Sequence, residues 1–195
     1  IKERFAFSSV KRPKGNLIWI NASSIGEYLA TVSLIKKIRK IKPKIKILLT
    51  TNTKTSALLA QKITNKNIFH QFTPQDNPLI IKKFLNYWKP SLVIWMESEF
   101  WPIILNETKK YGIKIILLNG RMSDKSFRNW SFFKFFFKEI TSNFSLILTM
   151  SKIDKENFKK LGTKNVNFIG NLKFSNKELQ YNQELEKKAK KIIGN

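Results

Sequence analysis

The stretch Leu17–Glu27, LIWINASSIGE, decides the expected fold, because a strand passes there through a short loop into a helix. Its first four residues are apolar and include two isoleucines, which is typical of a strand buried on both faces of a parallel sheet. Six further short apolar runs follow, separated by longer segments: Ile45–Thr50, Asn67–Phe72, Leu92–Met96, Ile113–Leu118, Leu146–Thr149 and Val166–Ile169. This alternation predicts an α/β domain with a Rossmann-like parallel sheet flanked by helices.

Two of the intervening segments carry helical periodicity. The second of them starts with Asn77-Pro78, a common signal for the beginning of a helix. The expected core-facing positions are Leu29, Val32 and Ile35 in the first segment and Ile80, Phe84 and Tyr87 in the second. Ligands of such sheets bind beyond the carboxyl ends of the strands, so the loops after the first, second, fourth and fifth runs are the places to look for chemistry.

Composition limits the class of protein. The chain has 195 residues, 42% of them hydrophobic, which is enough for a folded domain and too apolar for a disordered chain. The absence of cysteine excludes disulfides, cysteine-ligated zinc and a thiol nucleophile. The single histidine, His70, excludes a site built on two histidines, and we expect it to make a structural hydrogen bond. No apolar run approaches the roughly 20 residues of a membrane-spanning helix.

The chain is strongly basic, with 37 lysines and arginines against 13 acidic residues and a net charge of +24. Such a charge indicates an anionic partner, which is nucleic acid, an anionic lipid surface or a phosphorylated substrate. The alternative is that the charge is compositional, because the chain is also rich in Asn and Ile and no block of five consecutive basic residues occurs.

The strand–helix pattern weakens after Gly170. We therefore expect one α/β domain over residues 1–174. Residues 175–195 are then an interdomain segment, or the start of a second domain.

The first loop offers Ser24, Gly26 and Glu27. Gly26 permits close approach of a ligand to the backbone, and the helix start offers free N–H groups to an anion. Glu27 is placed to take a proton from a hydroxyl nucleophile. The alternative is that Ser24 and Glu27, three residues apart, form only a capping box at the start of the helix.

Two carboxylates, Glu97 and Glu99, follow the fourth apolar run. One can face the cleft while the other accepts N–H groups at the start of the next helix, or both can merely favour the helix dipole. Metal binding by the pair lacks a third ligand nearby in the sequence. Arg121, after the fifth run, suits a phosphate or carboxylate, and its alternative role is an ion pair with Glu97 or Glu99.

Residues Phe127 to Phe137 include six phenylalanines, a tryptophan and the basic residues Arg128 and Lys134, and Lys138 follows directly. The spacings Phe132–Phe136 and Phe133–Phe137 place pairs on common helical faces. We expect most of these rings in the core, and a minority at a membrane interface with the basic side chains near lipid phosphates.

Five motifs in order resemble those of the 3-deoxy-D-manno-octulosonic acid (Kdo) transferases of lipopolysaccharide synthesis. They are WINASSIGE (Trp19–Glu27), ILLTTNTKT (Ile47–Thr55), MESEFWP (Met96–Pro102), NGRMS (Asn119–Ser123) and GNLKF (Gly170–Phe174, with Ser151 before it). The resemblance implies the N-terminal half of a two-domain GT-B glycosyltransferase. In that family the N-terminal domain binds a lipid A precursor such as lipid IVA, and the C-terminal domain binds the donor CMP-Kdo.

The resemblance also implies roles for single residues. Glu27 would be the general base, with no metal and no cofactor beyond the donor substrate. The implied substrate-binding residues are Ser24, Gly26, Thr51, Glu97, Glu99, Arg121 and Ser123. The implied location is the cytoplasmic face of the inner membrane, with the chain peripheral or anchored by a segment upstream of residue 1, and nucleic acid is not an expected partner.

The sequence departs from the family pattern at three positions. Asn21 stands where the family has His, Gly120 where Ala is usual, and Ser175 where Asp follows the last motif. An asparagine cannot relay a proton as an imidazole does. The competing interpretation of the whole chain is a basic α/β module that binds nucleic acid or a membrane surface without catalysis.

Overall fold

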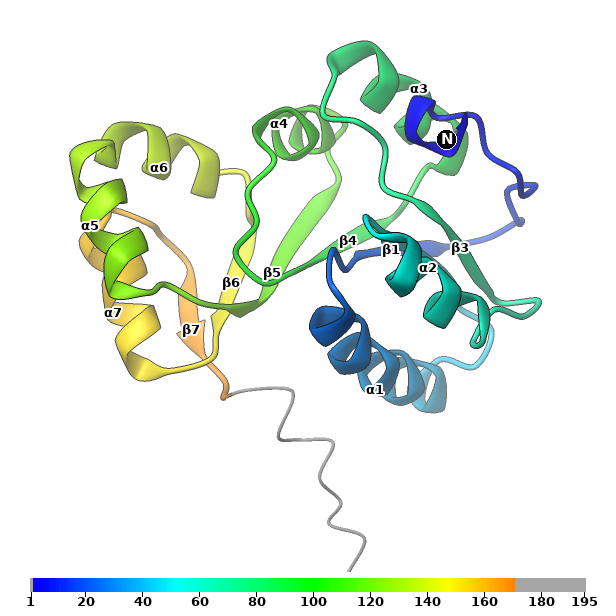
Figure 1. Cartoon of the computed structure of the whole chain (residues 1–195), viewed down its shortest axis with the longest axis horizontal. Coiled ribbons are helices and arrows are strands. Elements are labelled where there is room, and N and C mark those ends of the chain that lie inside the picture. Colours follow the sequence, from blue (N-terminus) through cyan, green and yellow to red (C-terminus); the bar gives the residue numbers. More distant parts are fainter. Residues whose placement is uncertain (1, 171–195) are drawn as a thin grey trace, which may run out of the picture.

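The protein, in a computed structural model that describes residues 2–170, is built on one seven-stranded parallel sheet with the strand order β3-β2-β1-β4-β5-β6-β7 (Figure 1). The strands are β1 (Leu17–Asn21), β2 (Lys46–Thr51), β3 (Ile68–Phe72), β4 (Leu92–Met96), β5 (Lys114–Gly120), β6 (Leu146–Thr149) and β7 (Val166–Phe168). All seven expected strands are present, each within two residues of its expected bounds. The Rossmann-like α/β prediction is confirmed, while the expected segment 175–195 lies outside the described residues.

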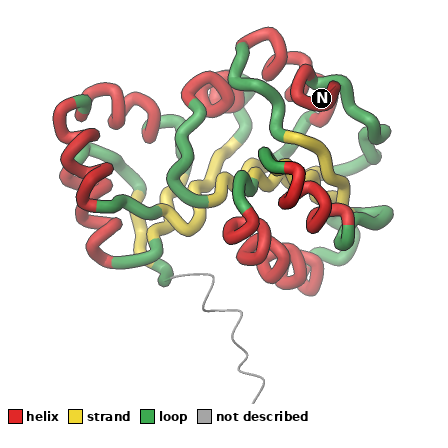
Figure 2. Tube along the Cα trace, viewed as in Figure 1, coloured by secondary structure: helices red, strands yellow, loops and turns green. Residues whose placement is uncertain are grey.

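Helices connect consecutive strands and cover both faces of the sheet (Figure 2). They are α1 (Ile25–Ile41), α2 (Lys54–Gln61), α3 (Pro78–Trp88), α4 (Pro102–Lys110), α5 (Asp124–Phe132), α6 (Lys134–Thr141) and α7 (Lys152–Lys160), after a short 3-10 turn at Lys2–Phe5 (η1). One core lies between the sheet and α3, α4, α6 and α7 and contains Trp19, Trp88 and Trp95. The other lies between the sheet and α1 and α2.

The expected core-facing positions of the two helices are confirmed in part. In α1, Ile35 is buried and Val32 packs against the core, whereas Leu29 is exposed and Tyr28 and Thr31 are buried beside Ile35. In α3, Phe84 is buried and Ile80 packs against the core, whereas Tyr87 is exposed; the other fully buried positions are Ile81, Leu85 and Trp88. The predicted start of α3 is confirmed, because the side chain of Asn77 accepts hydrogen bonds from the N–H groups of Leu79 and Ile80, with Pro78 at the first turn.

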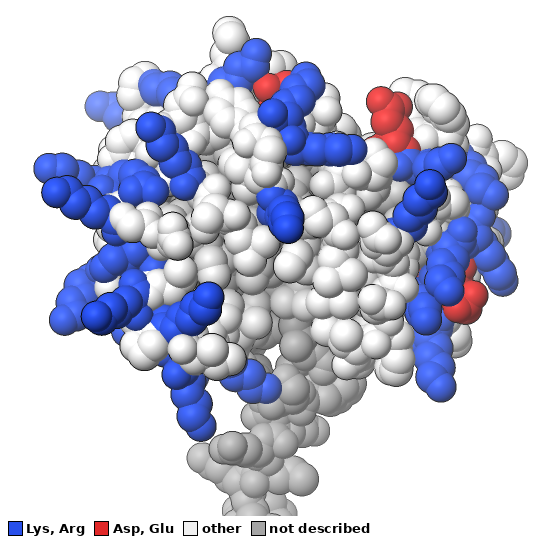
Figure 3. Space-filling model, turned by 180° about the vertical axis from the view of Figure 1, so that it is seen from behind, with Lys and Arg blue, Asp and Glu red and all other residues white. Residues whose placement is uncertain are grey.

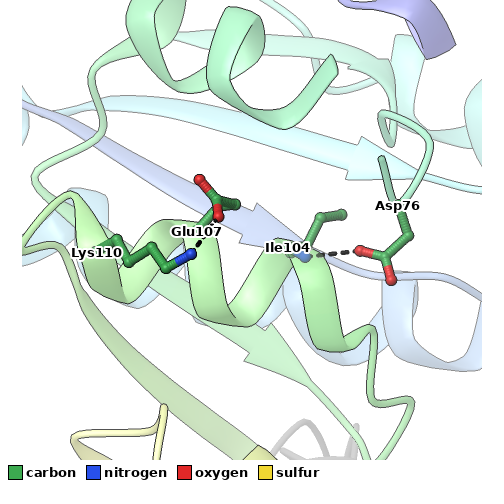
Figure 4. Close-up of polar contacts among 4 residues, drawn as sticks. All are labelled: Asp76, Ile104, Glu107 and Lys110. Carbon is green, nitrogen blue, oxygen red and sulfur yellow. Dashed lines mark hydrogen bonds and ion pairs between the residues drawn. The ribbon is translucent and has the colours of Figure 1, made fainter. Parts of the chain in front are cut away.

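The N-terminus of α4 is capped from a distant loop. Its N-cap residue, Trp101, makes no side-chain capping hydrogen bond. Asp76, from the loop between β3 and α3, accepts from the N–H of Ile104 at 2.6 Å (Figure 4). It also accepts from the N–H of Ile103 at 3.3 Å. Asp76 therefore occupies the capping position at the start of α4 for which Glu97 and Glu99 were candidates.

The phenylalanine-rich segment does not form one continuous helix. Phe133 ends α5 and precedes α6 with φ −116° and ψ 38°, so the expected pairing of faces across it is broken. Phe137 is buried and Phe127 is half-buried, whereas Phe132, Phe133, Phe135 and Phe136 are exposed. The expectation that most of these rings lie in the core is wrong.

The described residues contain no helix that is both long and apolar enough to span a bilayer.

Candidate active site

The topology places two of the expected acidic residues at one crevice. The strand order reverses between β1 and β4, which are adjacent, with Asn21 opposite Trp95. The loops that leave two such strands go in opposite directions and open a crevice at the carboxyl edge of the sheet, where ligands of α/β proteins bind. Glu27 follows β1 and Glu97 follows β4.

Glu27 combines a structural contact with a buried carboxylate. It is 3% exposed and lies in the first turn of α1. Its N–H donates to Ser24 Oγ at 3.3 Å, so Ser24 is the N-cap, and its Oε2 accepts from the N–H of Ser23 at 2.7 Å. Half of the expected capping box is therefore present. The carboxylate accepts from the backbone N–H of Ser23, the residue before the cap, and not from that of Ser24 as a capping box requires.

The surroundings of Glu27 raise its pKa from 4.5 to about 7. Burial is the main cause, because the charged form loses its hydration, and the negative charges of Glu97 and Glu99 add to the effect. The hydrogen bonds from Ser23 and Ser24 act in the opposite direction. A carboxyl group with a pKa near neutrality can both take and return a proton at working pH, which is what a general base requires.

Glu97 and Asn119 stand side by side with unusual backbone conformations. Glu97 has φ 57° and Asn119 has φ 62°, and the N–H of Glu97 donates to the carbonyl of Leu118 at 2.9 Å. Asn119 Nδ2 donates to Glu97 Oε1 at 3.4 Å. Asparagine adopts the left-handed region readily, but for a glutamate it costs about 1 kcal/mol or more, a kind of strain that gathers at functional sites.

Glu99 follows β4, Arg121 and Ser123 follow β5, and all three are exposed at the carboxyl edge of the sheet. The N–H of Arg121 donates to Ser98 Oγ at 2.8 Å, which ties the loop after β5 to the loop after β4. The expected alternative, an ion pair of Arg121 with Glu97 or Glu99, is not formed. Within residues 2–170 the ion pair present joins Lys110 to Glu107 at 2.8 Å. Ser123 is the N-cap of α5.

Thr51 lies beneath the site. It is fully buried, and its hydroxyl is 2.9 Å from Nε2 of His70, whose pKa is lowered by burial. The structural hydrogen bond expected of His70 is confirmed. Gly26 is the second residue of α1 and is half-buried.

The neighbouring Asn52 is a residue that the sequence analysis missed. Its Nδ2 donates to Ser23 Oγ at 3.1 Å, next to the carboxylate of Glu27. Its place in the ILLTTNTKT motif was the signal that could have found it.

Asn21, the departure from the family histidine, is completely buried. Its Oδ1 accepts from the hydroxyls of Thr50 at 2.8 Å and Thr73 at 2.9 Å, while Trp19 Nε1 donates to Thr50 Oγ1 at 2.8 Å. Asn21 Nδ2 has no hydrogen-bond partner within the described residues. Asn21 thus joins β1 to β2 and to the end of β3, at the end of the strand that precedes α1 and Glu27.

The described residues hold no cluster of three or more His, Asp or Glu side chains that could bind a metal ion.

Comparison with known proteins decides the family. A model of the 3-deoxy-D-manno-octulosonic-acid transferases matches residues 1–176. The chain belongs to the Kdo transferase family. A Kdo transferase of Rickettsia bellii is 42% identical over 94% of this chain and 44% of its own length. A Kdo transferase of Haemophilus influenzae is 30% identical over 96% of this chain, again 44% of its own length.

This Kdo transferase chain also resembles solved structures. The Staphylococcus aureus MnaA–UDP structure superposes with a TM-score of 0.61 over 83% of this chain and 46% of that chain, at 12% identity. A UDP-N-acetylglucosamine 2-epimerase from Rickettsia bellii gives 0.56 over 93% and 50%, at 14% identity. At such identities the likeness concerns the fold alone. The expected N-terminal half of a GT-B fold is confirmed, and the chain spans less than half the length of its Kdo transferase relatives.

Proposed function

We propose that this domain is the acceptor-binding half of an enzyme that transfers Kdo from CMP-Kdo to a lipid A precursor such as lipid IVA. The observation that carries the proposal is Glu27, a buried carboxylate at the reversal point of the sheet with a pKa of about 7. A group that is partly deprotonated at neutral pH and shielded from bulk water suits the activation of a sugar hydroxyl.

In the proposed reaction the ionised Glu27 carboxylate takes the proton from an acceptor hydroxyl. The hydroxyl oxygen forms a bond to the anomeric carbon of Kdo, and the bond from that carbon to the CMP phosphate oxygen breaks. CMP leaves with the electron pair. The protonated Glu27 then returns its proton to water. The reaction balances without a redox partner or a metal.

The surrounding residues support binding and positioning. Arg121 is exposed beside the crevice and suits a phosphate of the lipid A precursor or the carboxylate of Kdo. The negative charges of Glu97 and Glu99 add to the effect of burial, which is the main cause of the raised pKa of Glu27. Ser24, Gly26 and Ser123 lie at the starts of α1 and α5, where the helix N-termini favour anionic groups. Thr51 is turned into the interior, so its part is to support the loop.

The donor CMP-Kdo is bound mainly outside this chain in the proposed enzyme, because catalysis needs donor and acceptor held together across the cleft between two domains. The proposed location is the cytoplasmic face of the inner membrane. A net charge of +24 supports contact with an anionic surface, and Lys and Arg side chains gather at both ends of the rear face of the molecule (Figure 3).

The test joins this domain to the C-terminal half of the Rickettsia bellii relative and assays Kdo transfer from CMP-Kdo to lipid IVA. We expect Glu27→Gln to lower kcat by at least about 100-fold while leaving acceptor binding nearly unchanged. Glu139→Gln, on the exposed side of α6, is the matched control. A Glu27→Gln chimera with near-normal kcat would show that Glu27 only caps α1.

A binding experiment on the chain alone tests the assignment of substrates. We expect the 195-residue chain to bind lipid IVA in mixed micelles and to bind neither CMP nor single-stranded DNA at comparable concentrations. Tight binding of CMP would contradict the proposal that the donor is bound mainly outside this chain. Preferential binding of DNA would favour the nucleic-acid module.

A further inference from the structure

The segment from α5 to α6 carries the densest exposed aromatic surface of the described residues. Phe132, Phe133, Phe135 and Phe136 are 85, 63, 77 and 63% exposed. We call these four residues the aromatic corner. Other large apolar side chains with more than half their surface exposed are spread over α1, α2, α3, α7 and the N-terminal segment. Single exposed apolar residues are ordinary, but four adjacent phenylalanines in water indicate a surface that is covered in use.

Packing does not account for the corner. α5 contains no buried residue, and it is held to the core through Phe127 and Trp130, which are half-buried. Trp130 packs on Phe137 with ring centroids 5.2 Å apart. The inner side of the α5–α6 segment therefore packs on the core through Phe127, Trp130 and Phe137, and the four rings of the aromatic corner do not contribute to the core.

Basic side chains flank the aromatic corner on both helices. Lys125 and Arg128 precede Phe132 at helical spacings of seven and four residues, so the three lie along one side of α5. On α6, Lys134 and Lys138 lie over the turn after α7, because a methyl group built on Gly162 would meet Lys138 Cδ at 3.4 Å and Lys134 Cε at 3.8 Å. Aromatic rings edged by cations are the pattern that binds an anionic lipid surface, with rings among the acyl chains and cations at the phosphates.

The geometry points to the aromatic corner as a membrane-docking surface that inserts into the interface of an anionic bilayer. α5 connects the corner directly to the site, because its N-cap is Ser123, two residues after Arg121. A helix of nine residues is on the order of 13 Å long. Docking through the corner holds the crevice close to the lipid headgroups, where a lipid-linked acceptor is presented (Figure 1 shows α5 and α6 at the β5–β7 end of the sheet).

A second copy of the chain fits this surface less well. A two-fold interface on this surface would bring the basic residues of α5 and α6 close to those of the other copy, and like charges oppose such an association. Asp124 and Glu139 are the acidic residues of the two helices, against Lys125, Arg128, Lys134 and Lys138. An anionic lipid surface satisfies the rings and the charges together.

The test is flotation of the 195-residue chain with vesicles of phosphatidylcholine alone and with vesicles containing about one-third phosphatidylglycerol. We expect binding to the anionic vesicles, weakened by salt. The triple variant Phe132→Ser/Phe135→Ser/Phe136→Ser is expected to bind at least about tenfold more weakly. The matched control, Ile41→Ser/Leu58→Ser/Leu79→Ser, replaces side chains 78, 62 and 76% exposed on α1, α2 and α3 and is expected to bind within about twofold of the parent.

Two triple variants, each lacking three positive charges, distinguish docking through this surface from general attraction of a basic protein to an anionic membrane. Lys125→Gln/Arg128→Gln/Lys138→Gln is expected to weaken binding more than Lys36→Gln/Lys37→Gln/Lys40→Gln, which removes the same charge from α1. Equal losses for the two charge variants, or unchanged binding of the phenylalanine variant, would overturn the proposal. A dimer in sedimentation velocity that the phenylalanine variant abolishes would overturn it in favour of self-association. Circular dichroism and thermal unfolding establish that each variant is folded.

Discussion

The side chain of Asn119 holds the carboxylate of Glu97, and both residues have left-handed backbone conformations at the ends of neighbouring strands. The Asn119 amide lies 3.4 Å from Glu97 Oε1. β4 and β5 run parallel and in register up to Met96 and Leu118, so the chain turns sharply at the same level in both strands. This pair fixes one negative charge at the crevice, and that charge contributes to the raised pKa of Glu27.

The first prediction concerns this coupling. Glu97→Gln removes a negative charge that favours the protonated form of Glu27, so the pKa of Glu27 should fall below its value of about 7. It should stay above 4.5, because burial is the largest cause of the shift. The measurement is an NMR titration of the side-chain carboxyl carbon of Glu27. Glu139→Gln should leave the titration unchanged, and an unchanged Glu27 pKa in Glu97→Gln would refute the coupling.

The second prediction concerns stability and pH. The pKa of Glu27 is raised in the folded state, so between about pH 4.5 and 7 the folded protein holds a proton that the unfolded chain has lost. The contribution of Glu27 is therefore fully present below pH 4.5 and is lost as pH rises through 7. Over that window the free energy of unfolding of the parent, relative to Glu27→Gln, should fall by up to about 3 kcal/mol.

Urea unfolding of the parent and of Glu27→Gln at several pH values measures this difference. The Glu139→Gln variant should follow the parent at every pH, since its side chain is exposed. A difference between the parent and Glu27→Gln that stays constant from pH 4.5 to 8 would mean that Glu27 titrates like an ordinary surface carboxyl.

The third prediction concerns the buried amide of Asn21. Asn21→Ala leaves the hydroxyls of Thr50 and Thr73 without their shared acceptor and opens a small cavity, so unfolding should become about 2–3 kcal/mol easier. Thr73→Val removes one donor and keeps the volume, so its cost should be about 1 kcal/mol. Chemical denaturation measures both. If Thr73→Val lowered the free energy of unfolding as much as Asn21→Ala does, the larger loss expected for Asn21→Ala from its cavity and its second lost hydrogen bond would be refuted.

The sheet could be predicted from the sequence because its central strands β1, β2 and β4 are buried at nearly every position. Runs such as Leu92–Met96 are apolar at consecutive positions, which is the pattern of a strand buried on both faces of a parallel sheet. The helix faces could not be placed as well. Ile35 is buried in α1 as expected, but Tyr28 and Thr31 are buried while Leu29 is exposed, so hydrophobicity alone places the edge of the buried face wrongly.

The candidate site was predictable to the extent that it depends on topology and motifs. Glu27 and Glu97 follow adjacent strands, and the strand order alone brings them together. Contacts between loops that are distant in the sequence could not be predicted, because no local sequence pattern marks them. The hydrogen bond of Asn52 to Ser23 and the hydroxyl of Thr73 on Asn21 depend on how β2 and β3 lie beside β1. The exposure of the aromatic corner likewise depends on the break at Phe133.

The last prediction tests the remote cap of α4. Asp76 accepts hydrogen bonds from two N–H groups at a helix start whose own N-cap side chain makes none, and its negative charge favours the helix dipole. Asp76→Ala should lower the free energy of unfolding by about 1–2 kcal/mol and accelerate amide exchange at Ile103 and Ile104. Asp76→Asn keeps an acceptor without the charge, so its loss should be smaller. Asp124→Ala is the control, because Ser123 already caps α5 and little should change. If Asp76→Ala left the exchange of Ile103 and Ile104 untouched, the cap would contribute nothing to the position of α4 beside the Glu97–Glu99 loop.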